Sequence, residues 1–349
     1  MNTSQVNYLN IALMLISCVI AFILPFELFL FSYAILGPLH YLTEISWLHK
    51  RNYFAPRKND YILLVLLTLL IVFPGVFGYV YTTYGPKDTS GNLIVTEDIA
   101  GMMRFFSDIN PGIIFFAFAA SLIMIMVKNN AYRWMSFGLL LVIGLLIRKF
   151  EFSRVIFSMF LPTLIHVFLF TGAFILVGAL KSKSTSGYLS ILVFIGCAIS
   201  FFFIFPNGAG YQISEYAKRS YDVSLYSLNQ QIFHSFLNTP DADGQTVYYS
   251  STGILITRFI AYAYTYHYLN WFSKTSVIQW HKIPKQQLFV IISLWIISIV
   301  LYASNYYTGL MALYFLSFLH VVLEFPLNFQ SFKQIGEQLR LRFSFSRTG

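Results

Sequence analysis

Apolar runs of about 20 residues follow one another along most of this 349-residue chain. An α-helix of roughly that length crosses the hydrocarbon core of a membrane, whereas a core helix of a soluble protein is usually shorter. Short charged or polar segments separate the runs. The sequence therefore predicts an all-α fold, a polytopic integral membrane helical bundle.

The composition agrees with this fold class. Hydrophobic residues make up 57% of the chain and charged residues only 11%, against about a quarter in soluble proteins. The polar stretches are too short to build a hydrophobic core of their own. We therefore expect a single transmembrane domain over residues 1–330, with outer segments at about 83–110 and 206–252. A basic cytoplasmic tail would follow over residues 331–349.

The apolar runs and the charges between them predict about ten transmembrane helices. Their expected positions are residues 6–26, 27–48, 60–82, 111–128, 131–148, 153–180, 187–205, 253–273, 287–305 and 308–327. Within the outer segment 206–252, residues 214–238 carry tyrosines and phenylalanines that favour a helix lying at the membrane interface.

The positions of the basic residues orient this bundle. With the N-terminus in the cytoplasm, the cytoplasmic segments contain 15 of the 23 lysines and arginines: Lys50, Arg51, Arg57, Lys58, Lys128, Arg133, Lys181, Lys183, Lys274, Lys282, Lys285, Lys333, Arg340, Arg342 and Arg347. The positive-inside rule then places both termini in the cytoplasm. It also explains the net charge of +9, so we expect membrane lipid and no nucleic acid as partners, and a bacterial inner (cytoplasmic) membrane as the location.

Four of the seven histidines fall within predicted spans. They are His40, His166, His267 and His320, and in the ten-helix arrangement their helices all run from outside to inside. At about 1.5 Å of rise per residue the four imidazoles lie near mid-depth or in the inner half of the bilayer. Imidazoles from separate helices at similar depth can meet inside a bundle and hold a metal ion.

Two glutamates strengthen this interpretation. Glu44 follows His40 by four residues and Glu324 follows His320 by four, so each pair shares one helix face. Ionisable groups at such depth seldom persist without a partner. A carboxylate beside an imidazole serves as a ligand or orients the ligand histidine. This ligand set suits iron, and zinc or copper are also compatible with it.

A second polar and aromatic cluster lies at the cytoplasmic end of the predicted span 253–273. Tyr266, Asn270, Trp271 and Lys274 follow one another within nine positions, and we expect them to contact the substrate. Tyrosine and tryptophan are also common at membrane interfaces, so an aromatic belt explains part of the pattern. Cys18 and Cys197 both lie in apolar runs, and we expect them to be packing residues.

Other functions fit the same residues. Histidine and glutamate pairs inside spans also occur in proton relays and cation sites, which would make the protein a coupled transporter. Two of the histidines could instead be the axial ligands of a haem. A single histidine in a span often only donates a hydrogen bond to a neighbouring helix.

Single histidines on separate spans, glutamates one turn away and abundant aromatic residues resemble the bacterial Brp/Blh-type membrane carotene dioxygenases. The resemblance rests on His40 with Glu44, His166, His267, and His320 with Glu324. The family has an H-x-x-x-H pair, whereas this chain has H-x-x-x-E twice. The resemblance implies a non-haem iron (Fe²⁺) oxygenase acting on an apolar lipid or carotenoid, with the four histidines on the metal. Glu44 and Glu324 would have catalytic roles.

Overall fold

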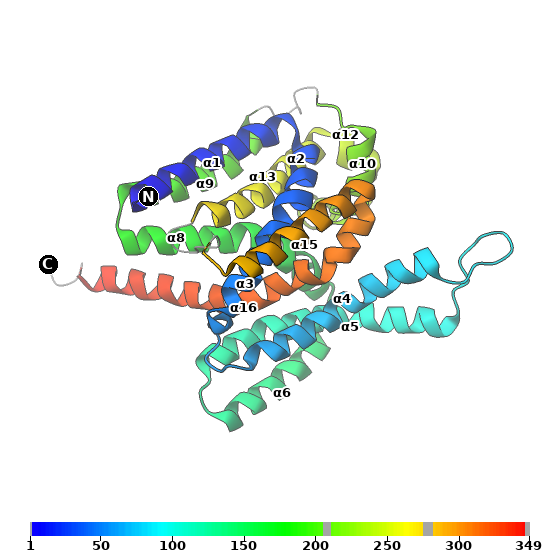
Figure 1. Cartoon of the computed structure of the whole chain (residues 1–349), viewed down its shortest axis with the longest axis horizontal. Coiled ribbons are helices and arrows are strands. Elements are labelled where there is room, and N and C mark those ends of the chain that lie inside the picture. Colours follow the sequence, from blue (N-terminus) through cyan, green and yellow to red (C-terminus); the bar gives the residue numbers. More distant parts are fainter. Residues whose placement is uncertain (1, 205–210, 275–281, 346–349) are drawn as a thin grey trace. The chain divides into compact units, whose positions relative to one another are not determined.

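The computed structural model describes residues 2–204, 211–274 and 282–345, which are helical almost throughout (Figure 1). The helices are α1 (Thr3–Ile23), α2 (Pro25–Phe31), η1 (Ser32–Leu36), α3 (Gly37–His49), η2 (Asn52–Phe54), α4 (Asp60–Tyr84), α5 (Glu97–Met126), α6 (Asn130–Ile147), α7 (Glu151–Ser153), η3 (Arg154–Phe170), α8 (Thr171–Ser182), α9 (Thr185–Phe203), α10 (Glu215–Asp222), α11 (Tyr226–Leu237), α12 (Gly244–Tyr249), α13 (Ser251–Ser273), α15 (Lys285–Ser304) and α16 (Tyr306–Phe345). These described ranges contain no β-strand, which confirms the all-α prediction.

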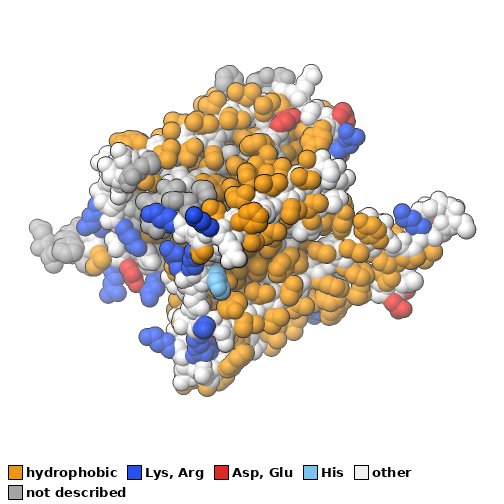
Figure 2. Space-filling model, in the orientation of Figure 1, with side chains coloured by type: hydrophobic (Ala, Val, Ile, Leu, Met, Phe, Trp, Pro, Cys, Tyr) orange, Lys and Arg blue, Asp and Glu red, His pale blue; other side chains and the backbone are white. Residues whose placement is uncertain are grey.

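Within the described residues, nine helical segments are long and apolar enough to cross a membrane. Each coincides with one of the ten predicted spans, and several are longer than predicted. Large hydrophobic side chains on these segments are exposed, as Leu66 of α4 and Val300 of α15 illustrate with 54% and 60% exposure. Hydrophobic side chains cover most of the face seen in Figure 2. An exposed apolar surface of this kind is what lipid requires.

The tenth predicted span, 253–273, forms a helix but is not among the nine. Its helix, α13, carries threonines, tyrosines, a histidine, an asparagine and an arginine, which lower its hydropathy. Most of its residues are buried, and Arg258 is 0% exposed. The helix predicted over 253–273 is therefore present as α13, and neighbouring helices bury most of its polar side chains.

The helices group into two compact units. The first comprises Met1–Trp47, Thr163–Leu310 and Gln330–Gly349. In it α13 packs against α1, α2 and α9 (Figure 1). Polar contacts tie these helices together: the Tyr266 hydroxyl donates to Asn10 Oδ1 over 3.1 Å, and the Cys18 thiol lies 3.9 Å from the Cys197 carbonyl. Both cysteines are free and buried, as expected for packing residues.

The second unit comprises Leu48–Pro162 and Met311–Phe329. Its helices α4, α5 and α6 pack side by side (Figure 1). Where α5 meets α6, a Cβ atom added to Gly112 would lie 2.4 Å from the Gly144 carbonyl oxygen. Only glycine permits this backbone approach, and small residues are the usual means by which membrane helices come close.

Three polar segments that the sequence analysis placed outside the transmembrane spans are largely helical in the structure. Of the outer segment 83–110, residues from Glu97 onward belong to α5. The expected interface helix over 214–238 is divided into α10 and α11. The basic tail expected over 331–349 continues α16 as far as Phe345. Hydropathy marks only where a helix becomes too polar for lipid, so a helix can extend beyond its apolar part.

Candidate metal centre

Irregular helices position two of the predicted histidines. His166 lies within η3, a π-helix that contains Pro162. His40 is on α3, directly after the π-helical segment η1 and the pair Gly37-Pro38. Proline lacks a backbone N–H, so it removes an i→i−4 hydrogen bond and permits a wider turn. Such π-helical insertions occur frequently at functional sites.

His40 and Glu44 form the contact that their spacing predicts. The Nε2 atom of His40 lies 3.0 Å from Glu44 Oε2, and the two side chains are only 2% and 1% exposed. Helical positions four residues apart face the same way, so one turn of α3 is sufficient to form this pair.

His267 of α13 contacts the His40 side of this pair. Its Nε2 atom lies 3.1 Å from the Nε2 atom of His40, and the two rings meet edge to face with centroids 4.7 Å apart. Its other ring nitrogen, Nδ1, lies 2.8 Å from the hydroxyl oxygen of Thr171 on α8. The imidazole of His267 therefore bridges a hydroxyl and the His40–Glu44 pair.

His166 packs against the same imidazole. Its ring centroid is 4.8 Å from that of His267, and the residue is 1% exposed. In the first unit the structure thus gathers three of the four predicted histidines and one of the two predicted glutamates from three separate helical elements. We name His40, Glu44, His166, His267 and Thr171 the imidazole cluster.

The distances inside the imidazole cluster match the edges of a metal coordination sphere. Metal–nitrogen bonds of about 2.0–2.1 Å at tetrahedral or right angles separate neighbouring ligand atoms by about 2.9–3.4 Å. The Nε2–Nε2 and Nε2–Oε2 separations of 3.1 and 3.0 Å fall in this range. The ring nitrogens of the buried His40 and His267 are close enough for both to bind one metal ion.

The number of hydrogens available on the imidazole nitrogens also favours a metal ion at this position. A neutral imidazole carries either one hydrogen or one lone pair on Nε2. The Nε2 atom of His40 faces two partners, a carboxylate that accepts hydrogen bonds and a second imidazole nitrogen. One hydrogen cannot serve both well, whereas a cation would attract the lone pairs of both nitrogens and the carboxylate together. Thr171 fits this arrangement, because an Nδ1–H of His267 that donates to its hydroxyl leaves Nε2 free to bind metal.

His320 and Glu324 lie in the second unit, on α16, and are 4% and 3% exposed. Their participation in the metal centre stays a prediction.

The residues predicted to contact substrate lie in the C-terminal part of α13 or directly after it. Trp271 packs edge to face on His40, with centroids 5.4 Å apart, and its indole N–H donates to Thr43 Oγ1 over 3.0 Å. Tyr266 is fully buried, and its hydroxyl also lies 3.4 Å from Asn270 Oδ1. Lys274 follows the last turn of α13, and burial lowers the pKa of its amine to about 8. Their role toward a substrate stays a prediction.

Thr171 is the cluster member that the sequence analysis missed. It follows His166 by five residues, a spacing that does not share a face on an ordinary α-helix but nearly does on a π-helix. Only Pro162, which marks the irregular helix, indicated this change of spacing. Of the other histidines, His49 contacts the Tyr53 hydroxyl over 3.0 Å and His234 is exposed. His281 lies outside the described residues.

No family model matches this chain, and no curated protein or solved structure matches it either. The imidazole cluster itself therefore provides the evidence from which a function can be argued.

Proposed function

We propose that the protein is a membrane-embedded, metal-dependent oxygenase that acts on an apolar lipid or isoprenoid, with non-haem iron as the metal. One observation carries the proposal: His40 Nε2 lies 3.1 Å from His267 Nε2 and 3.0 Å from Glu44 Oε2, among residues at most 6% exposed. Imidazole with carboxylate is the ligand combination of non-haem iron oxygenases.

His40, His267 and Glu44 would hold the metal, and His166 would complete or flank the site. We propose His320 as a further ligand oriented by Glu324, on the sequence argument that ionisable groups at this depth need a partner. A bound ferrous ion would supply a position at which O₂ binds and becomes reactive. The protein residues keep His267 in one tautomer through Thr171, hold a negative charge beside His40, and exclude water by burial.

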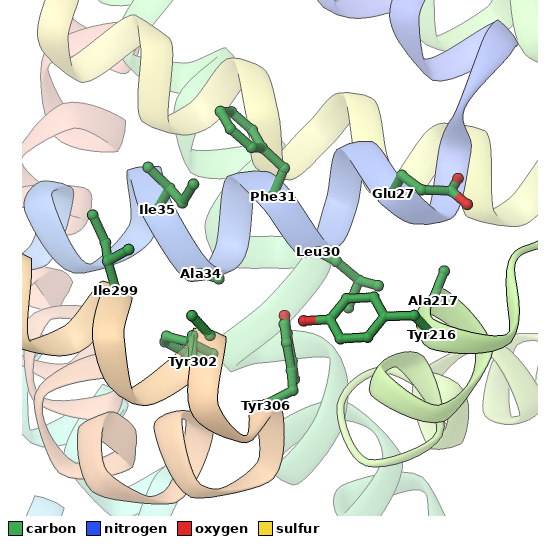
Figure 3. Close-up of a pocket in the computed structure, with 11 residues that line it drawn as sticks. Glu27, Leu30, Phe31, Ala34, Ile35, Tyr216, Ala217, Ile299, Tyr302 and Tyr306 are labelled. Atoms are coloured by element: carbon green, nitrogen blue, oxygen red, sulfur yellow. The ribbon is translucent and has the colours of Figure 1, made fainter.

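A largely apolar cavity in the first unit supports the proposal that the substrate is apolar. It has a volume of about 270 Å³ and lies along α2 and η1, where Leu30, Ala34 and Ile35 line one wall and Tyr302 and Tyr306 line another (Figure 3). Ile35 precedes His40 by only five residues, about 7.5 Å at the rise of an α-helix. Aliphatic and aromatic walls of this kind favour an extended hydrocarbon chain.

Metal content tests the proposal directly. The detergent-purified full-length protein is expected to contain stoichiometric iron by elemental analysis. His40→Ala and His267→Ala should each remove most of that iron, and His234→Ala, which changes the exposed histidine of α11, should not. Oxygen uptake upon addition of a carotenoid in micelles would test the reaction. A wild-type protein without stoichiometric metal after reconstitution with Fe²⁺ contradicts the proposal.

The same contacts favour a second candidate, a proton relay within a transporter. Thr171, His267, His40 and Glu44 form a chain of polar atoms with successive separations of 2.8, 3.1 and 3.0 Å. Protons can pass along such a chain without any metal. Two results together would favour this function: a purified protein without metal, and solute uptake into proteoliposomes that is driven by a proton gradient. The Glu44→Gln variant should lose this uptake.

A haem held between His40 and His267 is disfavoured. Two axial nitrogens on opposite faces of one iron are about 4 Å apart at bond lengths near 2 Å. The observed 3.1 Å separation leaves no space for a porphyrin between these two rings. Absence of a Soret absorption band in the purified protein would agree with this inference.

A further inference from the structure

A second cavity lies in the second unit, where α4 and α6 begin and α5 ends. Its volume is about 390 Å³, and its wall includes Arg57, Lys58, Asp60, Arg133 and Trp134. Three cationic side chains therefore face one carboxylate, an excess of two positive charges. The imidazole cluster and the proposed reaction use none of these residues.

Arg133 gives the cavity a buried hydrogen-bond donor. Its side chain is 5% exposed and donates through one terminal nitrogen to Asp60, which is itself buried. Among the described residues, its other terminal nitrogen, Nη1, is buried without a hydrogen-bond partner. A buried guanidinium N–H of this kind favours an acceptor oxygen, and guanidinium geometry suits phosphate.

Two further features favour an anion in the same place. Arg57 is held by a 2.7 Å hydrogen bond from Nη2 to the Lys128 carbonyl, which leaves its remaining N–H groups available near the cavity. The cavity also lies at the N-termini of α4 and α6, which are 25 and 18 residues long. Helix N-termini carry partial positive charge and attract anions.

We propose that this cavity binds the phosphate headgroup of an anionic phospholipid. Apolar side chains continue directly from its basic wall: Trp134 is 68% exposed at the rim, and Met135 and Leu139 are exposed along α6. Tryptophan beside basic residues is typical of the boundary between headgroups and acyl chains. A free phosphate ion would use the cations but would leave the adjoining apolar surface uncovered.

Lipid binding to the purified full-length protein tests this proposal, by native mass spectrometry with phosphatidylglycerol or phosphatidylcholine added. Phosphatidylglycerol should bind more tightly than phosphatidylcholine. The double variant Arg57→Ala/Lys58→Ala should weaken phosphatidylglycerol binding about thirty-fold, which corresponds to about 1 kcal/mol for each basic residue near a membrane surface. The matched control Lys181→Ala/Lys183→Ala removes the same charge at the C-terminal end of α8 and should bind as the wild type does.

Wild-type measurements provide a test that does not depend on the folding of a variant. Raising the salt concentration should weaken phosphatidylglycerol binding, because the cations at the rim are partly solvated. Equal affinity for the two lipids, or unchanged phosphatidylglycerol binding by the Arg57/Lys58 double variant, would overturn the proposal. Displacement of the lipid by micromolar inorganic phosphate would identify free phosphate as the ligand instead and also overturn it.

Discussion

Replacement of Thr171 by valine isolates the role of one hydroxyl in the proposed metal centre. Valine has nearly the same shape as threonine, and Thr171 is 1% exposed, so the packing around it should be retained. What is lost is the 2.8 Å contact with Nδ1 of His267. In the proposed metal-bound state that nitrogen would carry a hydrogen, which would then face a methyl group.

The magnitude follows from the burial of this N–H group. Leaving a buried donor unsatisfied costs about 1–3 kcal/mol. The metal-free protein avoids this cost when the imidazole adopts its other tautomer, with the hydrogen on Nε2, but that tautomer cannot bind metal. Metal affinity should therefore fall by about 10- to 100-fold, the usual effect of removing a residue that orients a ligand histidine.

Competition with a chelator of known affinity, followed by elemental analysis, would measure this change. Thr171→Ser keeps the hydroxyl and should retain affinity close to the wild-type value. Thr68→Val is the matched control, because Thr68 is equally buried but its hydroxyl only donates to the Leu64 carbonyl in the second unit. If Thr171→Val bound metal as tightly as the wild type, the assigned tautomer of His267 would be wrong.

Two further changes test the site and the fold. Glu44→Gln removes the charge beside His40 with little change in shape, and we expect metal affinity to fall at least ten-fold, measured by the same competition. Glu215→Gln, at an exposed position of α10, should have no effect. Gly112→Ala should destabilise the protein by about 1–3 kcal/mol because the new Cβ meets the Gly144 carbonyl. Gly138→Ala, where no atom lies within 4 Å of the added Cβ, should change stability by no more than about 1 kcal/mol. Thermal unfolding in detergent compares the two glycine variants, and equal loss in both would contradict the close approach of α5 and α6.

The positions of the long helices could be predicted from the sequence, because a helix that crosses a membrane needs a long run of apolar side chains. The predicted span 60–82 and the helix α4 (Asp60–Tyr84) illustrate this agreement. The ends of other helices could not be predicted, because a helix continues for as long as its hydrogen bonds and caps allow. The N-terminus of α5 is an example, where the Thr96 hydroxyl accepts from the Ile99 backbone N–H fourteen residues before the apolar part was expected to begin.

The contacts of the candidate site are of two kinds, between residues close in the sequence and between residues far apart in it. The contact between His40 and Glu44 follows from four-residue spacing on one helix, so the sequence was sufficient to predict it. The contact between His40 and His267 joins residues 227 positions apart and depends on how α3 packs against α13. Thr171 could not be found, since the π-helix η3 changes the spacing at which side chains share a face.

The burial of α13 explains how a polar helix is maintained in so hydrophobic a chain. Its side chains bond across to their neighbours: Ser273 donates to Asn10 over 2.9 Å, and Thr265 contacts Ser32 over 2.7 Å. Each of these bonds fixes the rotation of α13, because a helix that turned would leave buried polar groups unsatisfied. The orientation of His267 toward His40 is therefore determined by residues that do not touch the imidazole cluster. Such a network holds ligand atoms in place before any ligand arrives, which is the condition for a buried site to bind a cation without reorganising the helices around it.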